Sequence, residues 1–99
     1  MIMETMKRPE LQVMVKGKTY KVLEVVGLPG MVMPHHHSTG EAVVMVKKGE
    51  ALLKMCDGEH KLGKDSVFII PAKKEHTLTV LKEFKAVVTM AVNAEIQFI

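Results

Sequence analysis

Apolar and polar residues alternate along most of this 99-residue chain, in short runs that end at glycine or proline. A period of two is typical of β-strands, because successive side chains of a strand point to opposite faces. No segment keeps the 3.6-residue apolar period of an amphipathic helix, so we expect almost no helix. The pattern predicts strands at residues 11–16, 20–26, 31–37, 41–48, 50–56, 59–62, 66–70, 76–81, 85–92 and 95–99.

Turn signals separate these strands at intervals of roughly ten residues. The Asp57-Gly58 pair is the strongest hairpin signal, and Pro71 ends a strand or lies at an exposed sheet edge. Short strands at this spacing are typical of a β-sandwich or a small β-barrel. The predicted fold class is therefore all-β, and the choice between sandwich and barrel stays open at this point.

The composition indicates a single domain over residues 1–99 with an aliphatic interior. The chain is 47% hydrophobic but only 4% aromatic, and it holds nine methionines and no tryptophan. Because methionine is flexible, an interior rich in it can adapt to a small apolar ligand, although methionine also serves as ordinary core filler. Composition alone leaves both interpretations open.

The charge pattern argues against a nucleic-acid partner. The formal net charge is +3, and lysines occur in separated pairs such as Lys47-Lys48, with no aromatic residues between them to stack on bases. The single cysteine, Cys56, cannot form an intrachain disulfide, which fits a reducing compartment. No apolar run approaches the ~20 residues of a membrane span, and the N-terminus lacks a signal-peptide pattern. We expect a cytoplasmic protein without a membrane partner.

The most informative stretch for function is residues 33–41, where three histidines follow one another and a glutamate comes four residues later. In an extended strand, His35 and His37 share one face and His36 lies on the other. Two imidazoles with a nearby carboxylate, Glu41, supply most of a first-row metal site. The alternative is a polar loop of unliganded histidines.

A further histidine lies in a comparable context. The apolar segment 66–70 ends at Pro71, a short turn follows, and His76 opens the next predicted strand. In an antiparallel barrel such a position can point inward and face the strand of His35 and His37. Metal sites commonly draw their ligands from several strands in this way.

These residues resemble the two motifs of the cupin family, G-x5-H-x-H-x3,4-E-x6-G and G-x5-P-x-G-x2-H. The resemblance covers about residues 27–92. It implies a double-stranded β-helix, or jelly roll, in which two sheets enclose a metal at one end. The first motif corresponds to Gly30, His35, His37, Glu41 and Gly49, and the second to Gly63, Pro71 and His76. The metal ligands implied by the resemblance are His35, His37, Glu41 and His76.

Several spacings depart from the motifs. Four residues rather than five separate Gly30 from His35, and seven rather than six separate Glu41 from Gly49. Counting back from Gly49 puts Ala42 in the glutamate's place. Since a slip of one residue reverses a side chain's direction, Glu41 is either a ligand or a residue that points away, and His36 can substitute through a bulge.

The second motif also departs from the family pattern. Seven residues rather than five separate Gly63 from Pro71, and Lys73 replaces the glycine expected after that proline. We therefore expect the turn before His76 to be built differently.

The resemblance implies a divalent transition metal, with Fe, Mn, Ni, Cu and Zn all compatible with imidazole ligands. Our first hypothesis is a metal-dependent enzyme of dioxygenase type that acts on a small, largely apolar or aromatic molecule, with Glu41 as ligand or catalytic acid/base. The second is a non-catalytic small-molecule-binding or sensor module that uses the same pocket. The third is a barrel without either role, whose histidines bind metal adventitiously.

A homodimer is also expected from the resemblance, because small cupins commonly pair their sheets or exchange N-terminal strands. The N-terminal methionines and the segment Leu11–Val15 would supply the apolar contact surface.

Overall fold

The computed structural model describes residues 8–99 and is built from β-strands, which confirms the predicted all-β class. Nearly every predicted strand is present, with boundaries shifted by one or two residues. The strands are β1 (Glu10–Lys16), β2 (Tyr20–Gly27), β3 (Val32–Ser38), β4 (Ala42–Met55), β5 (Gly58–Leu62), β6 (Val67–Ile70), β7 (His76–Ala91) and β8 (Ile96–Phe98). Residues 8–99 contain no helix long and apolar enough to cross a membrane.

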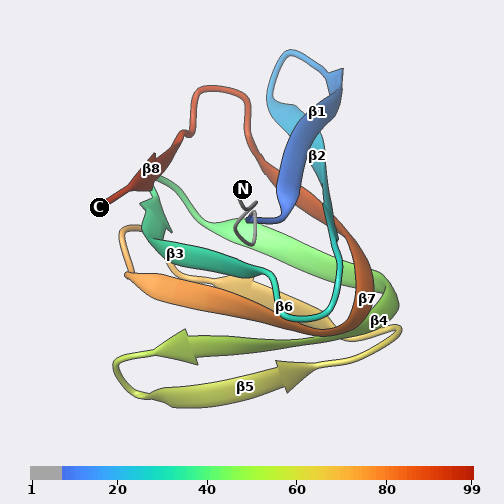
Figure 1. The fold of residues 1–99 in the computed structure, drawn as a ribbon. Helices are drawn as coiled ribbons and strands as arrows, with labels where there is room; N and C mark the ends of the chain where they lie inside the picture. The colour runs from blue at the N-terminus through green and yellow to red at the C-terminus, as the bar shows by residue number, and fades with distance from the viewer. Residues whose placement is uncertain (1–7) are drawn as a thin grey trace, which may run out of the picture.

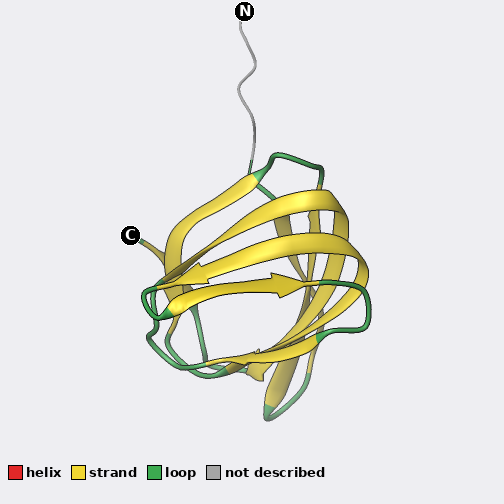
Figure 2. Ribbon diagram, turned by 90° about the horizontal axis from the view of Figure 1, so that it is seen from below, coloured by secondary structure: helices red, strands yellow, loops and turns green. Residues whose placement is uncertain are grey.

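Two long strands, β4 and β7, organise the fold. They pair antiparallel with each other from Ala42↔Met90 to Met55↔His76, and every other strand except the two outermost, β1 and β8, pairs directly with one of them. Along their outer edges, the first half of β4 pairs with β6 and the second half with β5. The first half of β7 pairs with β3, and the second half pairs with β2. The sheet therefore curls into two facing layers, β1-β2-β7-β4-β6 and β8-β3-β7-β4-β5 (Figure 1 and Figure 2).

The jelly roll implied by the resemblance is thus present. The choice left open between a sandwich and a barrel falls to a barrel, because one curled sheet forms both layers. The inner faces of both layers form one aliphatic core. Phe84, Leu53, Val46 and Val80 are its largest fully buried side chains. Outward positions alternate with these inward ones along β4 and β7, as the period of two predicts.

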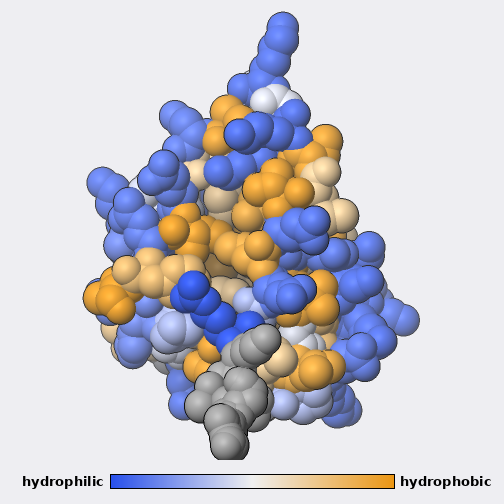
Figure 3. Space-filling view, turned by 45° about the horizontal axis from the view of Figure 1, so that its top comes forward, coloured by the Kyte–Doolittle hydropathy of each residue, from blue (hydrophilic) through white to orange (hydrophobic). Residues whose placement is uncertain are grey.

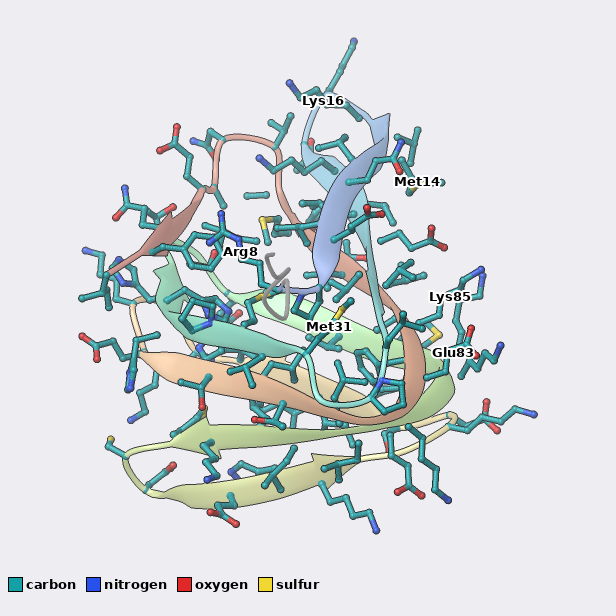
Figure 4. The ribbon with its side chains drawn as sticks, in the orientation of Figure 1. Arg8, Met14, Lys16, Met31, Glu83 and Lys85 are labelled. Atoms are coloured by element: carbon teal, nitrogen blue, oxygen red, sulfur yellow. The ribbon has the colours of Figure 1, made fainter. Side chains whose placement is uncertain are left out.

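The sequence analysis divided β4 and β7 into two strands each, whereas both continue through a bend. The register between them shifts at Val46/Lys48, Lys48/Glu50 and Glu50/Ala51, so the bend is a series of bulges rather than a break. Gly49 has a φ of +80° in this bend. A Cβ placed on Gly49 would lie 1.8 Å from the carbonyl oxygen of Glu83, which is at the corresponding bend of β7 (Figure 4).

This close approach predicts a large effect of substituting Gly49. We expect Gly49→Ala to lower the free energy of unfolding by on the order of 3 kcal/mol, because alanine combines a left-handed φ with a clash against main-chain atoms. Urea denaturation followed by circular dichroism measures this change. Gly63→Ala is the matched control, since a Cβ there meets nothing within 4 Å, and it should stay within about 0.5 kcal/mol. Equal effects of the two substitutions would contradict the role assigned to the bend.

Candidate functional site

Two histidines, His36 of β3 and His76 of β7, meet at one end of the barrel interior. Each is only 5% exposed, and the two are direct cross-strand partners. Their ring centroids are 4.1 Å apart with an interplanar angle of 66°, an edge-to-face contact. Two polar rings at the end of a largely apolar core make this the candidate site.

A bulge in β3 explains why His36, rather than its neighbours, faces inward. Met33 is buried, Pro34 and His35 are both exposed, and His36 is buried again. The pairing between β3 and β7 shifts register between Met33 and His36. Proline has no N–H for the ladder and is found at bulges, so Pro34 is suited to this position. The strand thereby contains one residue more than strict alternation allows.

Of the four ligands implied by the resemblance, the structure places only His76 in the interior. His35 is exposed, with its Nδ1 3.7 Å from the Glu75 carboxylate. His37 is half-buried on the outer face, and its Nε2 lies 3.1 Å from the Oε1 of Gln97 on β8. Glu41 is exposed, just before β4. The four side chains therefore do not converge.

A register shift of one residue accounts for this result and removes both departures in the first motif. His36 follows Gly30 after the expected five residues, and Ala42 precedes Gly49 by the expected six. Ser38 then takes the second histidine position. All three of His36, Ser38 and Ala42 are buried, at 5%, 3% and 4% exposure. The glycine spacings were the signal for this register, and the row of three histidines obscured it.

The turn before His76 keeps the shape that a glycine would have. Lys73, at the position where the family pattern has glycine, adopts a φ of +63°. Its N–H donates a 2.7 Å hydrogen bond to the Ser38 carbonyl and ties the turn to the end of β3. A lysine at this position thus adopts the left-handed conformation that glycine favours.

Main-chain carbonyls hold both inward imidazoles. Nδ1 of His36 lies 2.6 Å from the carbonyl oxygen of Pro34, and Nδ1 of His76 lies 2.9 Å from that of Lys74. A carbonyl oxygen only accepts hydrogen bonds, so Nδ1 carries the proton in each ring. The second nitrogen, Nε2, is left as the lone-pair nitrogen. Among residues 8–99 no hydrogen-bond partner of either Nε2 is found.

Burial keeps both rings neutral. Desolvation lowers the pKa of His36 to about 4, although the Pro34 carbonyl opposes it. Desolvation also lowers the pKa of His76, and the Lys74 carbonyl again opposes it. The ring of Phe98 packs against His36, with ring centroids 5.2 Å apart, and the Arg8 guanidinium lies 4.0 Å from the same Phe98 centroid.

The two histidines line a cavity of about 60 Å³ in the barrel interior. Its other lining residues are apolar and come from both sheets: Leu11, Val25, Met33, Ala42, Val44, Leu53, Leu62, Ile70, Leu78, Phe84, Ala86, Val88, Met90 and Ile96. With the top of the molecule turned forward, apolar side chains surround a hollow (Figure 3). The site is thus a small apolar cavity with a polar group at one end.

The donor set does not fit a resident divalent metal. Histidine-rich sites normally supply three or four protein ligands. Within residues 8–99 no group of three or more His, Cys, Asp or Glu side chains is placed around a common point. The interior offers two imidazoles, an alanine, and a serine whose Oγ already accepts a hydrogen bond from the Gly40 N–H at 3.3 Å.

Comparison with known proteins gives a consistent picture of the fold. A family model described as "Cupin domain" matches residues 23–92. No curated protein matches the chain.

Several solved structures share the fold. An uncharacterised conserved protein with a double-stranded β-helix domain from Klebsiella pneumoniae has a TM-score of 0.81 and 19% identity, over 98% of this chain and 84% of that one. The DMSP lyase DddQ from Ruegeria pomeroyi has a TM-score of 0.83 and 17% identity, over 92% and 51%. A salicylate 1,2-dioxygenase from Pseudoaminobacter salicylatoxidans has a TM-score of 0.79 and 14% identity, over 90% of this chain and 30% of that one. At these identities the likeness concerns the fold alone.

The buried His36 predicts that stability falls in mild acid. The imidazole of His36 takes up its proton near pH 6.5 in the unfolded chain and near pH 4 in the folded chain. Acid therefore favours the unfolded state between these two pH values. The contribution of neutral His36 to stability is fully present well above pH 6.5. Protonation of His36 alone should lower the free energy of unfolding by about 2 kcal/mol at pH 5. Urea denaturation at neutral pH and at pH 5 measures this loss. His36→Phe should remove that share of the loss, whereas His35→Gln on the outer face should retain it. An unchanged pH profile in His36→Phe would contradict the assignment.

Proposed function

Because this chain belongs to the cupin family, we propose that it is a small-molecule-binding cupin whose ligand occupies the apolar cavity inside the barrel. The observation that carries the proposal is the pairing of an aliphatic cavity with two neutral imidazoles at one end. Binding sites for small molecules are mostly apolar, with a few polar groups that set orientation. Of the hypotheses drawn from the sequence, this arrangement favours the non-catalytic binding module over the oxygenase.

The size of the cavity limits the ligand. A single water needs roughly 10–15 Å³ of such space, so about 60 Å³ holds a molecule of only a few non-hydrogen atoms. Pockets for drug-sized ligands span about 300–1,000 Å³. The proposed ligand is therefore much smaller than a flavonol or a sugar phosphate.

The oxygenase hypothesis receives less support from these residues. It requires a metal with an open coordination position, and the inward residues supply two nitrogen ligands. The dioxygenase among the similar structures is 14% identical to this chain over the aligned residues, which supports a common fold only.

We also propose that the protein forms a homodimer through β1. Among residues 8–99 this strand pairs only with β2, so within the described part of the chain one side of its backbone is left to pair. Val13, Met14 and Val15 are 48%, 55% and 59% exposed, an unusual row of apolar side chains for a surface strand. Met14 points away from the barrel (Figure 4). The N-terminal methionines, also expected in this interface, lie outside the described residues.

Xenon tests the binding proposal, because it occupies dry apolar cavities without needing a polar partner. We expect xenon pressure to shift the amide resonances of residues around the cavity in heteronuclear NMR spectra. Ala42→Leu, which fills the cavity from β4, should reduce these shifts at least about tenfold. Val43→Leu on the outer face of the same strand is the matched control. Xenon shifts confined to the outer surface would contradict an accessible interior cavity.

Analytical ultracentrifugation tests the dimer. The expected mass is twice that of the chain, and Val15→Lys should produce monomers, because burying a charge in an apolar interface is strongly unfavourable. Val67→Lys places the same change on β6, where the valine is 62% exposed, and should leave the dimer intact. A monomeric wild-type protein, or dissociation by Val67→Lys alone, would refute an interface at β1.

A further inference from the structure

The two cavity histidines offer hydrogen-bond acceptors and no donor. Their Nδ1 protons are directed at the carbonyls of Pro34 and Lys74. Each Nε2 therefore presents a lone pair. No side-chain nitrogen or oxygen in residues 8–99 is fully buried without a partner, so each Nε2 retains accessible surface. The polar end of the cavity thus has an acceptor-only character.

The rest of the cavity lining adds no hydrogen-bond donor. Every other residue of the cavity lining is apolar, so no hydroxyl, amide or cationic side chain of the lining donates toward a bound molecule. A ligand that brings only acceptors would face two lone pairs and would lose its water without compensation.

We propose that this cavity selects small neutral molecules that carry an N–H or O–H donor, and that it rejects carboxylates and other anions. This inference rests on the proposed binding function and names its ligand class. A donor group satisfies an Nε2 lone pair while the remaining atoms pack against the aliphatic wall. An anion offers neither a donor nor an acceptable charge in this environment.

Pyrrole and furan provide the sharpest test. Both are five-membered rings of nearly the same size, but pyrrole carries an N–H donor and furan carries an oxygen acceptor in its place. Titrations followed by NMR at neutral pH should show pyrrole binding at least about tenfold more tightly than furan. Acetate should give no shifts at the cavity residues. Equal binding of pyrrole and furan, or binding of acetate in the cavity, would overturn the inference.

Variants locate the preference. His76→Leu and His36→Leu each replace one acceptor by an apolar side chain of similar size. The ratio of the pyrrole and furan affinities should therefore shrink toward unity. His60→Leu is the control, because His60 lies outside the cavity and stacks on Phe68 with ring centroids 4.8 Å apart. A preference that persists when both cavity substitutions are combined would contradict the assignment to these rings.

A measurement on the unmodified protein covers the case in which the cavity variants fail to fold. Long-range ¹H–¹⁵N spectra of the imidazole rings report which nitrogen carries the proton. We expect the proton on Nδ1 for both His36 and His76, and a proton on either Nε2 would overturn the proposal. One tightly held metal ion per chain, retained after dialysis against a chelator, would overturn it as well, because the lone pairs would then be occupied.

The outcomes separate this inference from the proposed function. If xenon and furan enter the cavity and pyrrole binds no better than furan, the binding function stands and the donor preference fails. If none of xenon, pyrrole and furan shifts the resonances of the cavity residues, the binding function fails.

Discussion

The antiparallel pairing of β4 with β7 is the constraint on which the rest of this structure depends. These two strands run side by side over their whole length, and each provides a pairing edge to both layers of the barrel. They can do so only by bending together, and the bend brings the backbone of Gly49 against the carbonyl of Glu83. One residue without a Cβ at this position allows a single pair of strands to build both sheets. The cavity between the sheets is a consequence of that bend.

The all-β class could be predicted from the sequence because the period of two and the turn signals are both local, whereas the jelly roll was implied by the resemblance to the cupin motifs. Alternation in β4 and β7 follows the inward and outward positions closely, and the hairpin expected at Asp57-Gly58 is present, with Cys56 and Asp57 in the turn and Gly58 opening β5. Glycine at position 49 was interpreted as the end of a strand, since a glycine inside a strand and a glycine after one give the same local signal. Whether a partner strand bends in register is a non-local fact.

The inward histidine was harder to predict for a physical reason. Strict alternation through residues 33–37 puts Met33, His35 and His37 on one face, whereas the bulge at Pro34 and His35 carries Met33 and His36 inward instead. A row of three identical residues offers no contrast that reveals such a slip. The distances from Gly30 and Gly49 did contain the correct register, because positive φ values fix both glycines, Gly30 in the turn before β3 and Gly49 in the bend of β4. For the register of β3, the spacing to a glycine that the backbone requires was a better guide than the positions of the histidines.

The same one-residue slip decides the chemistry of the interior. With His36, Ser38 and Ala42 turned inward, two imidazoles remain where the motif would place three histidines and a glutamate. Burial without a counter-charge then drives the rings to the neutral form, and the carbonyls of Pro34 and Lys74 fix the tautomer. A cavity of this kind stabilises a ligand by apolar contact and by accepting its protons in hydrogen bonds, whereas a metal centre acts by supplying positive charge. The barrel is the same in both cases, so the identity of three inward positions on β3 and β4, rather than the fold, decides which of these two kinds of site the interior offers.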